Sequence, residues 1–194
     1  MAATRRMTRQ QRRARVTVRR SRRQYLWIAL AAAAVVVLAV LLLRAGGSAS
    51  APDGVEVFPN LSRDHTTGRV NYPQTPPAGG PHAPAWQNCG FYDQPIANET
   101  AVHSLEHGAV WITFHPDLPP GQVDALRRLA RQTFVIASPF PDLPAPIVAS
   151  AWGHQLRLPS ATDPRLAQSV RYFRLGPQTP EPGAACTGGV GIPE

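Results

Sequence analysis

The chain has 194 residues and a formal net charge of +8, from 20 basic and 12 acidic side chains. Every basic residue is an arginine, and ten of them lie between Arg5 and Arg23, so the positive charge is concentrated in the N-terminal tail. Residues 51–194 carry nine arginines and all 12 acidic residues, a net charge of −3 (9 − 12). This charge argues against nucleic acid as the partner of the C-terminal part of the chain.

The first expected element is a membrane-spanning helix over residues 25–43, which follows a basic tail over residues 1–24. Its sequence, YLWIALAAAAVVVLAVLLL, contains no charged residue, proline or glycine. Nineteen helical residues extend about 28 Å, enough to cross the hydrocarbon core of a bilayer. We therefore predict a signal-anchor helix.

The arginine asymmetry around this segment predicts its orientation. The positive-inside rule places the N-terminus in the cytoplasm and the C-terminal part outside the membrane. We expect the arginine-rich tail to contact anionic lipid. A signal peptide cleaved near residues 49–51 is the alternative, but the apolar run is longer than a signal core and Pro52 would follow the cut.

Residues 44–54, RAGGSASAPDG, are small and polar and predict a flexible linker. Residues 55–194 are then expected to form one extracytoplasmic domain. All 21 prolines lie beyond residue 43, so this domain should consist of short elements joined by rigid loops.

Helices and strands alternate irregularly along this domain, which predicts a small α+β fold. An ordered loop is expected over residues 69–95, and a coil over the C-terminal residues 180–194. Asn98 suits the N-cap of the first helix and Thr162 that of the last. The helices are expected at 99–107, 120–132 and 163–173, and the strands at 109–114, 134–138, 146–152 and 154–158.

The two cysteines, Cys89 and Cys186, both fall in the part of the chain expected outside the cytoplasm. That compartment is oxidising, so a disulfide between them is expected. The alternative is that Cys89, which is close to several histidines in the sequence, binds a metal ion as a thiolate.

Four blocks of the domain resemble a known family. PPAGGPHAPAWQNCGFYD, NETAVHSLEHGAVWITFHPDLP, SPFPDLPAPIVASAWGHQL and PEPGAAC look like successive blocks of the bacterial domain-of-unknown-function family numbered 3105. The resemblance covers roughly residues 55–190. It implies one N-terminal membrane helix and gives weight to the histidine-containing blocks, and it carries no activity with it.

The histidines are the residues most suited to chemistry. His103 and His107 in HSLEHG are four positions apart, so a helix would place both on one face. His82, in the stiff GGPHAP loop, is the candidate third ligand, and Glu106 is a candidate fourth ligand or an acceptor for an imidazole N–H. Imidazoles suit copper and zinc equally, so either metal is predicted. His65, His115 and His154 receive no role or a weaker one.

Two other interpretations of the histidines remain open. They could hold loops by hydrogen bonds in a domain that binds another envelope protein without any metal. HSLEH also matches the His-x-x-Glu-His pattern of inverted zinc proteases, in which Glu106 would activate water. Glu181, the downstream acidic residue that could complete such a site, lies between two prolines and cannot lie inside a helix. We therefore assign no catalytic residue.

Overall fold

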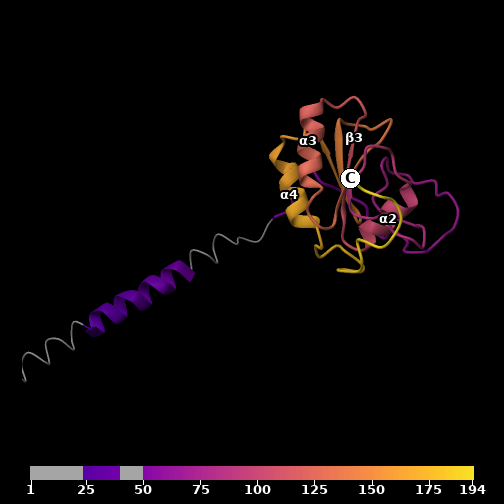
Figure 1. Ribbon diagram of the computed structural model, residues 1–194. Helices are drawn as coiled ribbons and strands as arrows, with labels where there is room; N and C mark the ends of the chain where they lie inside the picture. Colours follow the sequence, from indigo (N-terminus) through magenta and orange to yellow (C-terminus); the bar gives the residue numbers. More distant parts are fainter. Residues whose placement is uncertain (1–23, 40–49) are drawn as a thin grey trace, which may run out of the picture. The chain divides into compact units, whose positions relative to one another are not determined.

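The computed structural model describes residues 24–39 and 50–194, which belong to two separate units, Met1–Ser48 and Ala49–Glu194. In the first unit, residues 24–39 form a helix (Figure 1). The side chains of this helix are exposed. The basic tail up to residue 23 and the last four residues of the predicted span, 40–43, lie outside the described residues. Among the described residues no helix combines the length and the apolar character needed to span a bilayer. The membrane anchor therefore stays a prediction.

The second unit contains a six-stranded mixed sheet. Its strand order is β1-β6-β5-β3-β4-β2, in which β3, β4 and β2 run parallel and the remaining neighbours are antiparallel. The strands are β1 Glu56–Val57, β2 Gly90–Phe91, β3 Val110–Phe114, β4 Val135–Pro139, β5 Ile147–Ala151 and β6 His154–Leu158. The predicted α+β class is confirmed.

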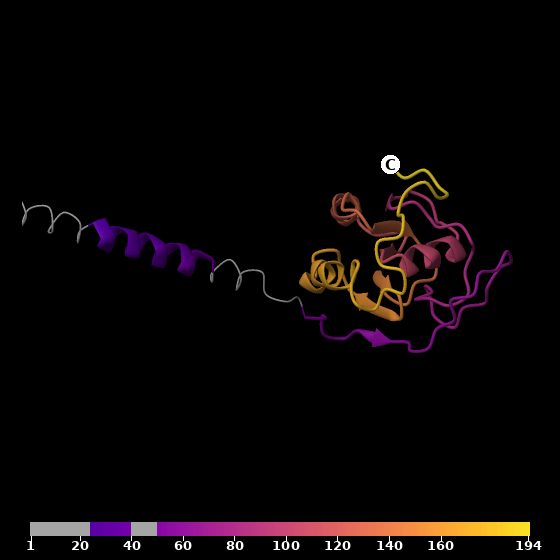
Figure 2. The same ribbon diagram turned by 90° about the horizontal axis from the view of Figure 1, so that it is seen from below.

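Three helices cover the two faces of this sheet. They are α2 Asn98–Glu106, α3 Pro120–Leu129 and α4 Pro164–Phe173. Helices α3 and α4 lie on one face and α2 lies on the other (Figure 1, Figure 2). Side chains of a strand alternate between the two faces of the sheet. Val110 and Ile112 therefore pack in the hydrophobic core between the sheet and helices α3 and α4, whereas Trp111 packs in the core between the sheet and α2.

Two predicted helix caps are wrong. Asn98 is already helical, and Ala97 holds the N-cap position of α2 without a side-chain hydrogen bond. The cap of α4 is Asp163, not Thr162, and its Oδ1 accepts a hydrogen bond from the backbone N–H of Arg165 at 2.9 Å. The reason is Pro164, which disfavours helical angles at the residue before it and so makes Asp163 the last extended residue.

The disulfide between Cys89 and Cys186 is present, as the sequence predicts. Their Cα atoms are 5.4 Å apart, and the N–H of Cys89 donates to the carbonyl of Cys186 at 2.8 Å. The alternative role of Cys89 as a thiolate ligand is therefore excluded. The bridge holds the C-terminal segment against the long loop that precedes α2.

Candidate metal centre

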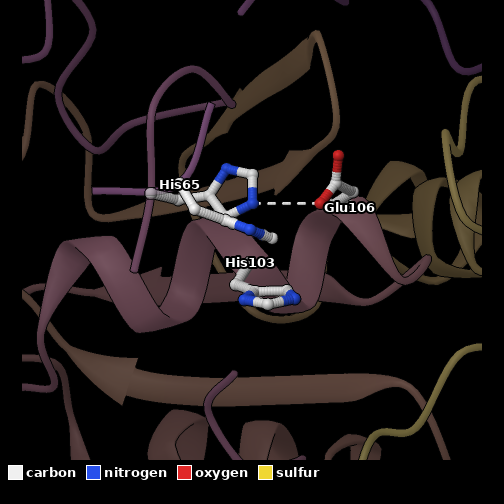
Figure 3. A group of neighbouring side chains, drawn as sticks. His65, His103 and Glu106 are labelled. Carbon is white, nitrogen blue, oxygen red and sulfur yellow. Dashed lines mark ion pairs between the residues drawn. The ribbon is translucent and has the colours of Figure 1, made fainter. Parts of the chain in front are cut away.

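Four side chains form a group that could hold a metal ion: His65, His82, His103 and Glu106. One possible ligand atom of each lies within 4.8 Å of those of the other three. His82, His103 and Glu106 are buried, whereas His65 is exposed, so the group opens to solvent on one side. Figure 3 shows His65, His103 and Glu106 gathered against α2.

Helix α2 contributes two members of this group, His103 and Glu106, whereas its C-cap residue His107 lies outside the group. Successive residues of a helix are rotated by roughly 100°, so Glu106 and His107 lie on opposite flanks of His103. Glu106 turns toward the loop that carries His65. His107 turns toward the C-terminal segment, where its Nδ1 donates to the carbonyl of Ala185 at 2.6 Å.

The loop before α2 brings His82 to the helix. Gly79 has a φ of +139°, and a Cβ at this position would lie 2.6 Å from Cδ1 of Leu61, so only glycine fits. The backbone of His82 then pairs with the segment around His65. The His82 N–H donates to the carbonyl of Asp64 at 3.0 Å, and the Thr66 N–H donates to the carbonyl of His82 at 2.7 Å. These two bonds place His65 beside His82.

Hydrogen bonds determine which ring nitrogens are free. Nδ1 of His82 is 2.8 Å from the carbonyl oxygen of Gly80, and Nδ1 of His103 is 2.7 Å from that of Ala83. A carbonyl only accepts hydrogen bonds, so Nδ1 carries the proton in both rings. In the neutral imidazole, Nε2 then presents a lone pair. This arrangement, with one nitrogen fixed by the backbone and the other free, is the usual state of a metal-binding histidine.

Two polar atoms of the group lie close together without forming a hydrogen bond. Nε2 of His82 is 3.0 Å from Oε2 of Glu106, the contact dashed in Figure 3, yet Nε2 has no hydrogen-bond partner. Both side chains are almost fully buried, at 0% and 2% exposed. With Nδ1 protonated, neutral His82 has its Nε2 lone pair beside a carboxylate oxygen. Two acceptors this close require a metal ion near both, or a proton on Nε2 or on the carboxyl group.

Burial also favours the neutral form of His103. Desolvation lowers the pKa of His103, the hydrogen bond to Ala83 opposes this shift, and the nearby imidazoles of His107, His82 and His65 lower the pKa further. The ring therefore keeps its Nε2 lone pair at neutral pH, which metal binding requires.

The structure brings together His82, His103 and Glu106 from the predicted set and leaves His107 outside the group. The ring of His107 packs edge-on against His103, with centroids 4.5 Å apart, and against Trp86 at 5.3 Å, but His107 is not among the four grouped side chains. His65 takes the fourth place, which sequence reasoning missed. A backbone pairing with His82 places it there, and its ring lies 4.9 Å from that of His82 and 5.0 Å from that of His103. No motif in the sequence signals that pairing.

The remaining histidines lie elsewhere. His115 pairs with Asp117 at 3.6 Å, and His154 packs against Phe173 of α4. The position of His107 also differs from the inverted zinc-protease pattern, in which both histidines of His-x-x-Glu-His bind the ion and the glutamate does not.

The fold and the site define a small mixed α+β domain with a buried histidine–carboxylate cluster beside one helix. A family model described as "Protein of unknown function (DUF3105)" matches residues 64–188, and the chain belongs to this family. The resemblance of the four sequence blocks is thereby confirmed. No curated protein and no solved structure matches the chain.

Proposed function

We propose that the protein binds a zinc or copper(II) ion through His65, His82, His103 and Glu106. The observation that carries this proposal is the buried approach of two acceptor atoms, Nε2 of His82 and Oε2 of Glu106, at 3.0 Å. Bonds of about 2.0–2.1 Å at tetrahedral angles put the ligand atoms of one zinc ion roughly 3.3 Å apart. These two atoms are already near that separation.

The other ligands must move inward by a small amount. The four atoms spread over as much as 4.8 Å, more than the separation within one coordination shell. His65 can supply the movement because it is exposed and lies on a loop, whereas His82 and His103 are fixed by their Nδ1 hydrogen bonds. His65 would close over an ion that first meets the buried ligands.

The donor set favours divalent ions over copper(I). Three imidazoles and one carboxylate suit zinc and copper(II), whereas copper(I) prefers thiolate and thioether ligands. Both cysteines are joined in the disulfide, and the two methionines are Met1 and Met7, far from the site in sequence.

The competing function is an interaction domain for another envelope protein, in which a doubly protonated His82 satisfies Glu106 and the histidines only hold loops. Zinc titration of the full-length chain separates the two. Without reductant, which would free the cysteines, we expect one ion to bind per chain. Free zinc at 100 times Kd should stabilise the fold by about 2.7 kcal/mol. Binding should weaken at acidic pH, because protons compete for the imidazoles.

Calorimetry and thermal unfolding measure both effects, and calcium, which prefers oxygen ligands, is the matched control ion. Trp86 and Trp152 provide a third readout, since their rings lie 5.9 Å from His103 and 5.8 Å from His82, so copper(II) should quench their fluorescence. A flat zinc titration with an unchanged melting curve would favour the protonated His82 and the interaction domain.

We further propose that the domain works at the outer face of the bacterial membrane, where it would bind or deliver the ion. The arginine asymmetry around residues 25–43 and the disulfide, which is typical of an oxidising compartment, support this location. Protease added to intact spheroplasts should digest residues 55–194 and leave the N-terminal tail intact. A C-terminal domain that resists digestion until the cells are lysed would reverse the proposed orientation.

A further inference from the structure

We infer that Arg63 sets the affinity of the site for its metal ion. Its guanidinium serves as the counter-ion of Glu106 in the metal-free site and competes with the metal ion for this carboxylate. This competition keeps the metal ion exchangeable. This inference rests on the proposed metal binding and names the group that regulates it. Nε of Arg63 donates to Oε1 of Glu106 at 2.7 Å. Nη2 of the same guanidinium donates to Oε1 of Glu181 at 2.9 Å.

The buried carboxylate makes this contact more than a surface ion pair. Exposed ion pairs contribute little, because water screens both charges. The Glu106 side chain, however, is only 2% exposed. When no metal ion is bound, Arg63 is the permanently charged cation, among the described residues, that contacts its carboxylate. A buried carboxylate without a counter-ion is strongly destabilising. Arg63 therefore stabilises the metal-free site.

Metal binding would change the charges around the Glu106 carboxylate. It would bring positive charge to Oε2 of Glu106, while the guanidinium sits on Oε1 of the same carboxylate. The two cations repel each other and share the charge of one ligand, so each lowers the affinity of the carboxylate for the other. The stabilisation that Arg63 provides in the metal-free site is thus partly lost when the metal binds.

Glu181 offers Arg63 a second partner. It lies in Pro-Glu-Pro, and its backbone N–H donates to the carbonyl of Glu106 at 3.0 Å, so its carboxylate is held close to the site. The planar fork of arginine reaches both carboxylates at once, which a lysine could not do equally well. When a metal neutralises Glu106, Arg63 keeps its bond to Glu181.

The test is the zinc affinity of full-length Arg63→Gln, measured by competition with a chelator of known affinity. We expect binding on the order of tenfold tighter than in the wild type, together with a lower melting temperature of the metal-free chain. A residue that only held the His65 loop in place would have the opposite effect on affinity. Weaker or unchanged binding by Arg63→Gln would overturn the inference.

Two further variants sharpen this test. Arg69→Gln removes the same charge from an exposed arginine that forms no ion pair within residues 24–39 and 50–194, and it should leave zinc affinity within twofold. Glu181→Gln should weaken binding in the wild type but have little effect in the Arg63→Gln background, because it acts through Arg63. Equal effects of Glu181→Gln in both backgrounds would contradict this coupling. Absence of zinc binding by the wild type itself would instead refute the proposed function.

Discussion

Replacing His82 with alanine is expected to weaken zinc binding by about 100-fold or more. Loss of an outer partner of a metal ligand commonly costs 10–100-fold in affinity, and loss of the ligand itself should cost at least as much. His103→Ala should have a similar effect. Calorimetric titration of each full-length variant, with chelator competition where binding is tight, measures the change.

The most informative comparison is between His65→Ala and His107→Ala. Sequence spacing predicts His107 as a ligand and gives His65 no role, whereas the structure groups His65 with the other ligands. We expect His65→Ala to lose most of the zinc affinity and to keep its stability, because this side chain is exposed. His107→Ala should retain zinc binding and lose about 1 kcal/mol of stability with its hydrogen bond to Ala185.

His115→Ala is the matched control, since His115 is a partly exposed histidine outside the group. It should change neither affinity nor stability appreciably. If His107→Ala abolished binding while His65→Ala preserved it, the ligand set read from the sequence would be correct and the set proposed from the structure would be wrong.

Removing the disulfide is expected to produce the largest loss of stability. The bridge spans a sequence separation of 97 residues, so opening it should greatly increase the freedom of the unfolded chain. The Cys89→Ser/Cys186→Ser variant should therefore be about 2–4 kcal/mol less stable than the wild type. Urea unfolding monitored by tryptophan fluorescence gives this difference.

Reduction provides an internal control for the disulfide variant. A phosphine reductant should lower the stability of the wild type to that of the double serine variant and should leave the variant unchanged. A wild-type unfolding curve unaffected by complete reduction would show that the bridge contributes no stability. The native C-terminal contacts, including that of Ala185 with His107, would then hold the segment without it.

Local patterns in the sequence were sufficient for most of the fold. The three helices and the four longer strands of the domain lie where periodicity and proline placement predict them, with ends shifted by a few residues. Such patterns report which face of an element is buried, and this depends on neighbours in the chain. The two-residue strands β1 and β2 were missed because they are too short to show alternation.

Only the tertiary structure decided which histidines lie together in the candidate metal site. The sequence determined that HSLEHG ends a helix and that the GGPH loop is stiff, and His82, His103 and Glu106 follow from these two features. Helical spacing made His107 an equally good partner of His103, because it cannot tell which flank of the helix faces the site. That depends on where the His65 segment and the disulfide-linked C-terminal segment pack against α2. Both are long-range contacts, and one backbone pairing, between His65 and His82, completes the site.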